Sequence, residues 1–121
     1  MIETPAFLSS ARDEGIDEEE RSRIVSYLAM NPAAGDLIQG TGGARKARFA
    51  PAGKGKSGGY RVITFCAAED MPVFLLDVYR KGARSDLTQS EKNELRKVLA
   101  LLPKVWREQP TRGATTKRRP Q

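Results

Sequence analysis

Three consecutive runs of strand-forming residues constrain the fold more than any other feature of the sequence. They cover residues 45–50, 60–67 and 73–81, and connections of hairpin length separate them. Strands joined in this way pair in antiparallel fashion, because a parallel pair needs a crossover of about a dozen residues or more. The sequence therefore predicts a central antiparallel sheet rather than a doubly wound parallel one.

Helical patterns precede the strands. Asp17 and Glu20 have the spacing of a capping box, and the apolar residues after them recur at helical spacing, which predicts a helix over residues 17–30. We expect a further short helix around Phe7, after a first strand near residues 1–4.

A helical pattern also follows the strands. It begins with a second capping box at Thr88 and Glu91. The apolar stripe after this box consists of Leu95, Val98, Leu99, Leu102 and Trp106. We expect this stripe to pack on the sheet. The predicted fold class is therefore α+β, a small central antiparallel sheet flanked by N-terminal helices and a C-terminal helix.

The chain is expected to form one domain. Its 121 residues, 39% of them apolar, can bury one modest core, which we place in residues 1–108. Residues 109–121 carry the cluster Lys117-Arg118-Arg119 without apolar periodicity, which indicates a disordered basic tail. No apolar run approaches the roughly 20 residues that cross a bilayer, and residues 1–10 lack the pattern of a secretion signal. We expect a cytoplasmic protein that does not contact membranes.

The sequence contains no histidine, which removes the commonest general base and the commonest zinc ligand. A Ser-His-Asp hydrolase, a histidine-dependent nuclease and an ordinary zinc site are excluded on this ground, and we expect no metal or other cofactor. The only cysteine, Cys66, lies in an apolar run, where a small buried side chain is expected rather than a nucleophile.

Positive charge is concentrated after residue 41. Residues 1–41 carry three basic and eight acidic side chains, a net charge of −5, whereas residues 42–121 carry eighteen basic and seven acidic ones, a net charge of +11. No acidic residue occurs from residue 42 to residue 61, and the six cations there are Arg45, Lys46, Arg48, Lys54, Lys56 and Arg61. Because solvated surfaces usually mix both signs, this run predicts a functional positive field on one loop and its flanking strands.

Residues 50–57 fit a relaxed phosphate-loop pattern, Ala/Gly-x4-Gly-Lys-Ser, and residues 73–77 have the form of an apolar strand that ends in an acid. A nucleotide-binding loop opens into a helix whose N-terminus receives the phosphate. Here Ser57 is followed by two glycines and a strand-forming run, which argues against a nucleotide-hydrolysing domain.

The last predicted strand has two distinct faces if its side chains alternate regularly. One face carries Phe74, Leu76 and Val78, and the other carries Asp77, Tyr79 and Lys81. We expect the first face to join the core and the second to be available for a site.

Glycine-rich or cationic motifs fall in three stretches, residues 42–50, 53–63 and 72–82, and a fourth motif with Asp86, Leu87, Thr88 and Glu91 follows them. The second reads Gly-Lys-Gly-Lys-Ser-Gly-Gly-Tyr-Arg-Val-Ile. Their order and spacing resemble the RelE/ParE toxin superfamily, and its HigB branch most closely, over residues 1–108. The resemblance implies the toxin of a type II toxin-antitoxin pair, with an antiparallel sheet flanked by helices.

The resemblance also implies a site. In the RNases of the family, loop lysines, a strand arginine and a cation on the next strand form the catalytic centre. The matching residues here are Lys54, Lys56, Arg61 and Lys81. The expected RNA contacts are Arg45, Lys46, Arg48, Tyr60 and Tyr79, where the tyrosines, like Phe49, either stack on a base or serve as ordinary packing.

The implied partners are messenger RNA, the ribosome and a cognate antitoxin. The antitoxins of the family often carry a helix-turn-helix, so the pair is expected to bind its own promoter DNA through the antitoxin.

Clustered cations suit RNA cleavage without a metal. The ribose 2′-hydroxyl must lose a proton to attack phosphorus, the phosphorane charge must be stabilised, and the leaving oxygen must be protonated. Neighbouring cations lower the pKa of a lysine, whereas an arginine stays charged and clamps phosphate. We assign Lys54 or Lys56 as general base, Arg61 as the transition-state clamp, and Lys81 as phosphate binder or proton donor.

Two other functions remain open at this stage. A ParE-like protein shares the fold but inhibits DNA gyrase without cutting RNA, and a non-catalytic module would bind RNA or the ribosome only. The loop lysines together with Arg61 argue against the first of these.

Overall fold

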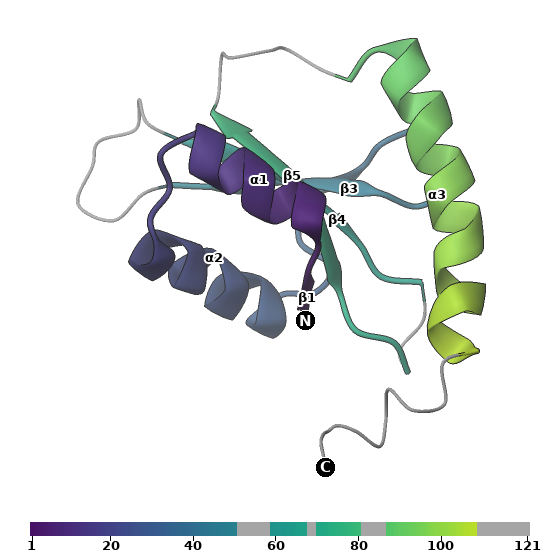
Figure 1. Ribbon diagram of the computed structural model, residues 1–121, viewed down its shortest axis with the longest axis horizontal. Helices are drawn as coiled ribbons and strands as arrows, with labels where there is room; N and C mark the ends of the chain where they lie inside the picture. The colour runs from purple at the N-terminus through teal and green to yellow at the C-terminus, as the bar shows by residue number, and fades with distance from the viewer. Residues whose placement is uncertain (51–58, 68–69, 81–86, 109–121) are drawn as a thin grey trace.

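The computed structural model describes residues 1–50, 59–67, 70–80 and 87–108, which form three helices and a five-stranded sheet (Figure 1). The strands are β1 (Ile2–Glu3), β2 (Asp36–Leu37), β3 (Arg45–Phe49), β4 (Tyr60–Phe65) and β5 (Phe74–Arg80). The helices are α1 (Pro5–Asp13), α2 (Glu18–Met30) and α3 (Gln89–Arg107). The predicted α+β class and the predicted order of elements are confirmed, and β2 is an addition.

The strands lie in the order β1-β5-β4-β3-β2. β3, β4 and β5 pair in antiparallel fashion, as their short connections predicted, and β2 is antiparallel to β3. β1 joins the opposite edge parallel to β5, so the sheet as a whole is mixed. Most of the chain lies between β1 and β5, which provides the long connection that a parallel pair requires.

Each helix begins at a capping side chain, and two of these three caps, Asp17 and Thr88, were predicted from the sequence. Thr4, Asp17 and Thr88 are the N-cap residues, and the side-chain oxygen of each accepts a hydrogen bond from the backbone N–H three residues later. At α3 the capping box with Glu91 is complete. These bonds satisfy backbone donors that have no partner within the helix and so fix where each helix starts.

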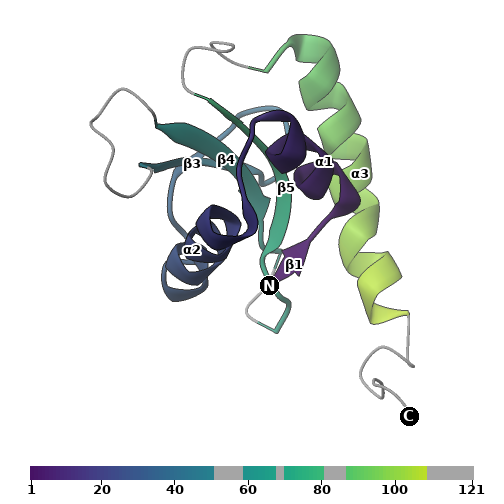
Figure 2. The same cartoon turned by 60° about the vertical axis from the view of Figure 1, so that its left-hand side comes forward.

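The helices cover both faces of the sheet (Figures 1 and 2). α1 and α2 lie on one face, where Phe7, Ile24 and Leu75 belong to one buried cluster. α3 lies on the other face, where Leu99 packs in a second cluster with Phe74. Because both faces are buried over most of their area, an open site is expected only near the ends and edges of the strands.

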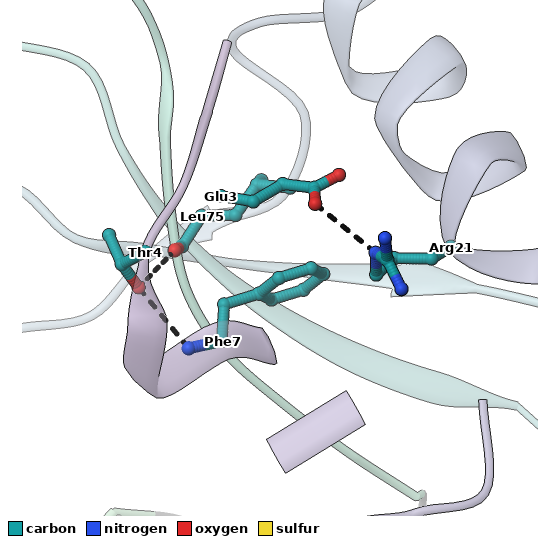
Figure 3. Close-up of polar contacts among 5 residues, drawn as sticks. All are labelled: Glu3, Thr4, Phe7, Arg21 and Leu75. Atoms are coloured by element: carbon teal, nitrogen blue, oxygen red, sulfur yellow. Dashed lines mark hydrogen bonds and ion pairs between the residues drawn. The ribbon is translucent and has the colours of Figure 1, made fainter. Parts of the chain in front are cut away.

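A short polar network fastens the N-terminal segment to β5 and α2 (Figure 3). The Thr4 hydroxyl donates a hydrogen bond of 2.7 Å to the Leu75 carbonyl and accepts one of 3.2 Å from the N–H of Phe7. The Nε of Arg21 donates a hydrogen bond of 3.1 Å to the Glu3 carboxylate. Together with burial of the Phe7 ring, these contacts place α1 and α2 on the sheet.

The predicted faces of β5 are wrong because its pairing with β4 shifts by one residue. Ile63 lies opposite Asp77 and Thr64 lies opposite Leu75, so Leu76 has no residue directly across from it. The extra residue reverses the alternation. Val78 consequently packs under α1 and α2, whereas Phe74, Leu76 and Tyr79 all pack on the α3 side.

Cys66 and Val98, both predicted to be buried, are exposed. Cys66 is exposed because β4 ends one residue earlier, and its thiol donates a long hydrogen bond, 3.8 Å, to the Met71 carbonyl. Val98 belongs to the outer side of α3 and is 49% exposed, while Leu95, Leu99, Leu102 and Trp106 form the stripe that packs on the sheet.

The expected basic tail, residues 109–121, lies outside the described residues. Within the ranges described, no helix combines the length and apolar character needed to cross a membrane.

Candidate functional site

β3 and β4 bring three of the predicted cations to one face of the sheet. Side chains alternate between the faces along a strand, and directly opposite residues share a face. Arg48 lies opposite Arg61, and Lys46 lies opposite Ile63, which belongs to the cluster under α3. Lys46, Arg48 and Arg61 therefore point to the α3 side of the sheet.

These three side chains line an open groove of about 430 Å³, which we call the cationic groove. The groove exists because β2 pairs only with Arg45 and Lys46, which leaves the rest of the β3 edge uncovered. Asp36 and Tyr27 also line it. Three cations against one carboxylate give the cationic groove a net positive charge.

The pairing of Arg48 with Arg61 places two guanidinium groups directly across from each other. Like charges in this position destabilise a sheet unless an opposite charge lies near them. In the part of the chain that the structure describes, no carboxylate forms an ion pair with either side chain. Arg48 is exposed and Arg61 half-buried, so both can reach an anion that enters the cationic groove.

Arg45, also predicted to contact RNA, lies apart from this group. It pairs with Thr64 and so points to the face that α1 and α2 cover. Its Nη1 donates a hydrogen bond of 3.0 Å to the Gly35 carbonyl. The side chain thus holds the segment before β2 against β3 and does not line the cationic groove.

The predicted tyrosines lie in the core. Tyr60 is 5% exposed in the cluster under α1 and α2, with the Arg80 guanidinium 5.3 Å from its ring centre, and Tyr79 is 4% exposed in the cluster under α3. Their burial agrees with the packing alternative and leaves almost no ring surface for a base. Phe49 is half-buried, and its ring lies 6.0 Å from that of Tyr27.

Three predicted catalytic residues, Lys54, Lys56 and Lys81, lie outside the described residues. The two lysines at 54 and 56 belong to the connection between β3 and β4, and Lys81 follows the last residue of β5. The run after this connection forms strand β4 and not a helix, which confirms the argument against a nucleotide-binding loop. Among the described side chains, no group of three or more His, Cys, Asp or Glu is placed to hold a metal ion.

Gly35, directly before β2, allows the chain to lie close to the backbone of β3 beside the cationic groove. We expect Gly35→Ala to lower the free energy of unfolding by about 1 to 3 kcal/mol more than Gly40→Ala does, measured by urea denaturation. Both glycines have positive φ, 94° and 84°, so both substitutions strain the backbone. Only at Gly35 would a Cβ lie 2.5 Å from a backbone oxygen, that of Lys46. Equal losses at the two positions would contradict this account.

Residues 2–117 match the family model described as RelE toxin of the RelE/RelB toxin-antitoxin system. The match spans nearly all of the 121 residues. The chain belongs to the RelE toxin family. A RelE toxin is one member of a toxin-antitoxin pair, so its partner is a cognate antitoxin, and toxins of this family typically inhibit translation by cleaving messenger RNA.

In this RelE toxin, sequence reasoning missed two residues that line the cationic groove. Asp36 belongs to β2, a strand of two residues that is too short to give a periodic signal. Tyr27 belongs to the apolar residues that recur at helical spacing in α2, a pattern that favours core packing, yet it is 42% exposed. The one sequence signal that could have identified Tyr27 is its position directly before Leu28, beside the buried stripe of α2 rather than in it.

Proposed function

We propose that this RelE toxin is a metal-independent endoribonuclease of the HigB type that cleaves messenger RNA on the translating ribosome and so arrests translation and growth. The observation that carries the proposal is the cross-strand pair of Arg48 and Arg61 in the cationic groove. RNA supplies a negative charge at every nucleotide, and a phosphate between two guanidinium groups accepts charge-assisted hydrogen bonds from both. Anion binding therefore offsets the repulsion between the two guanidinium groups.

The proposed reaction uses the RNA's own nucleophile. The 2′-oxygen loses its proton to Lys54 or Lys56 and bonds to the adjacent phosphorus, while the bond from phosphorus to the 5′-oxygen breaks. Arg61 stabilises the negative charge of the phosphorane through two hydrogen bonds. Lys81 binds the phosphate or donates a proton to the departing 5′-oxygen. The products are a 2′,3′-cyclic phosphate and a 5′-hydroxyl.

The remaining partners follow from this activity. Arg48 and Lys46 hold the strand by its phosphates, and the ribosome presents the message to the toxin in the cytoplasm. The antitoxin, with a helix-turn-helix, binds the toxin and connects it to promoter DNA. An acidic antitoxin segment in the cationic groove would compete directly with the RNA.

The products test the proposal. We expect purified toxin, added to a translation extract, to cut the message within codons that ribosomes occupy and to leave 5′-hydroxyl ends, mapped by ligation with and without prior phosphorylation. Attack by a metal-bound water would instead leave a phosphate monoester at either the 3′- or the 5′-end and would form no cyclic phosphate. Ends without a cyclic phosphate would contradict the mechanism. Intact message together with inhibited DNA supercoiling would favour the gyrase alternative.

A further inference from the structure

A second cavity adjoins the cationic groove on the other side of the open β3 edge. It has a volume of about 750 Å³ and lies between the outer side of α2 and the end of β3. Its walls include Tyr27, Phe49 and Arg23, together with two serines, Ser22 and Ser26. We call it the aromatic pocket. Tyr27 lines both the aromatic pocket and the cationic groove, so the two lie next to each other.

The aromatic pocket presents planar surfaces to a ligand. The rings of Tyr27 and Phe49 are 6.0 Å apart with 58° between their planes, and the Arg23 guanidinium lies 5.8 Å from the centre of the Phe49 ring. Nucleobases stack on aromatic rings and on arginine planes. Because Tyr27 is 42% exposed, a large part of its ring remains available to a ligand.

The charges of the two cavities differ in sign. The cationic groove has three cations and one carboxylate, whereas the aromatic pocket has Glu18 and Glu19 against Arg23. A phosphate is attracted to the groove and repelled from the pocket. A base is uncharged, and its amino groups can donate hydrogen bonds to carboxylates. The distribution of charge thus orients a nucleotide across the β3 edge.

We propose that the aromatic pocket binds one nucleobase of the strand whose phosphates occupy the cationic groove; this rests on the proposed function. The base passes the uncovered edge of β3 and stacks on Tyr27, with the Arg23 guanidinium beside it. Arg23 is kept near this position by Glu20, whose Oε1 lies 3.6 Å from its Nε. The pocket therefore adds affinity at one nucleotide position without supplying a reacting group.

Binding of two single-stranded hexamers tests the assignment. Both contain deoxyribose throughout, which prevents cleavage through a 2′-hydroxyl, and one of them lacks the base at its third position. We expect the complete hexamer to bind the wild-type toxin on the order of tenfold more tightly at one fixed salt concentration, because stacking of a base contributes that much. Equal affinities for the two hexamers would overturn the proposal.

Two variants locate the effect. Tyr27→Ala removes the stacking surface, and Ser26→Trp fills the pocket from an exposed helical position without removing a contact. We expect both to bring the affinity ratio of the two hexamers close to one. Ser9→Trp, the same change at an exposed serine of α1 that does not line the pocket, should keep the wild-type ratio. A wild-type ratio in Ser26→Trp would overturn the proposal even if Tyr27→Ala failed to fold.

Failure of the pocket and failure of the nuclease give different results. Arg61→Ala should weaken both hexamers alike and keep their ratio, because it removes a phosphate contact only. If the ratio is one while message is still cut, the pocket assignment is wrong and the proposed function stands. If the ratio is tenfold but no message is cut, the proposed function is wrong. If the pocket variants lose antitoxin binding and leave the ratio unchanged, the pocket is a protein interface and the assignment is overturned.

Discussion

Arg61→Ala is expected to slow message cleavage by about 100- to 1,000-fold, the usual effect of removing one donor that stabilises charge in a transition state. The reason is geometric. Arg61 is half-buried on β4, directly opposite Arg48, and in the proposed mechanism its guanidinium stabilises the phosphorane. Cleavage is measured under single-turnover conditions in the translation extract, and RNA affinity is measured separately.

The affinity measurement decides what Arg61 does. A residue that acts in the transition state should change cleavage far more than binding, whereas a non-catalytic RNA-binding module should lose binding and growth arrest in parallel. Arg61→Lys keeps the charge but not the two parallel hydrogen bonds, so its cleavage rate should lie between those of the wild type and Arg61→Ala. Arg12→Ala makes the same charge change at an exposed position of α1 outside the cationic groove and should cleave normally.

Phe7→Ala is expected to lower the free energy of unfolding by about 3 to 5 kcal/mol, since it removes a ring that is 0% exposed from the cluster between α1, α2 and the sheet. A domain of this size has about 5 to 15 kcal/mol of stability in total, so the variant should be close to unfolding. Urea denaturation followed by circular dichroism gives the value.

The matched control lies two residues away. Ser9 is exposed on the same helix, and Ser9→Ala should change stability by no more than about 0.5 kcal/mol. Phe7→Leu keeps most of the apolar volume and should cost less than Phe7→Ala. A loss below about 1 kcal/mol in Phe7→Ala would show that α1 is not fixed to the sheet by this ring.

The elements themselves were predictable because their signals are local. The capping side chains Asp17 and Thr88 mark the starts of α2 and α3, and short connections set the pairing of the three central strands. The cationic stretch was also visible as a run without acids. The opposite orientations of Arg45 and Lys46 could also have been predicted, because successive side chains of a strand point to opposite faces of the sheet.

The errors arose where pairing between distant residues decides the outcome. Leu76 is the extra residue in β5 only because of the way that strand meets β4, and no local pattern encodes this. The exposure of Cys66 depends in the same way on where β4 stops pairing. Tyr27 on α2 and Phe49 on β3 meet only in the folded protein, so the pocket between them could not be predicted from the sequence.

The parallel edge strand has a consequence for synthesis. β1 is hydrogen-bonded to β5, the last strand of the sheet in the sequence, with the N–H of Ile2 donating to the Val73 carbonyl. In the strand order of the sheet, β2, β3 and β4 are not neighbours of β1. During translation β1 is made first, but it cannot pair until β5, about seventy residues later, has also been made. A product truncated before residue 74 would lack the strand that joins β1 to β4. A ribosome making this toxin therefore does not meet a copy with a complete sheet until β5 has been made.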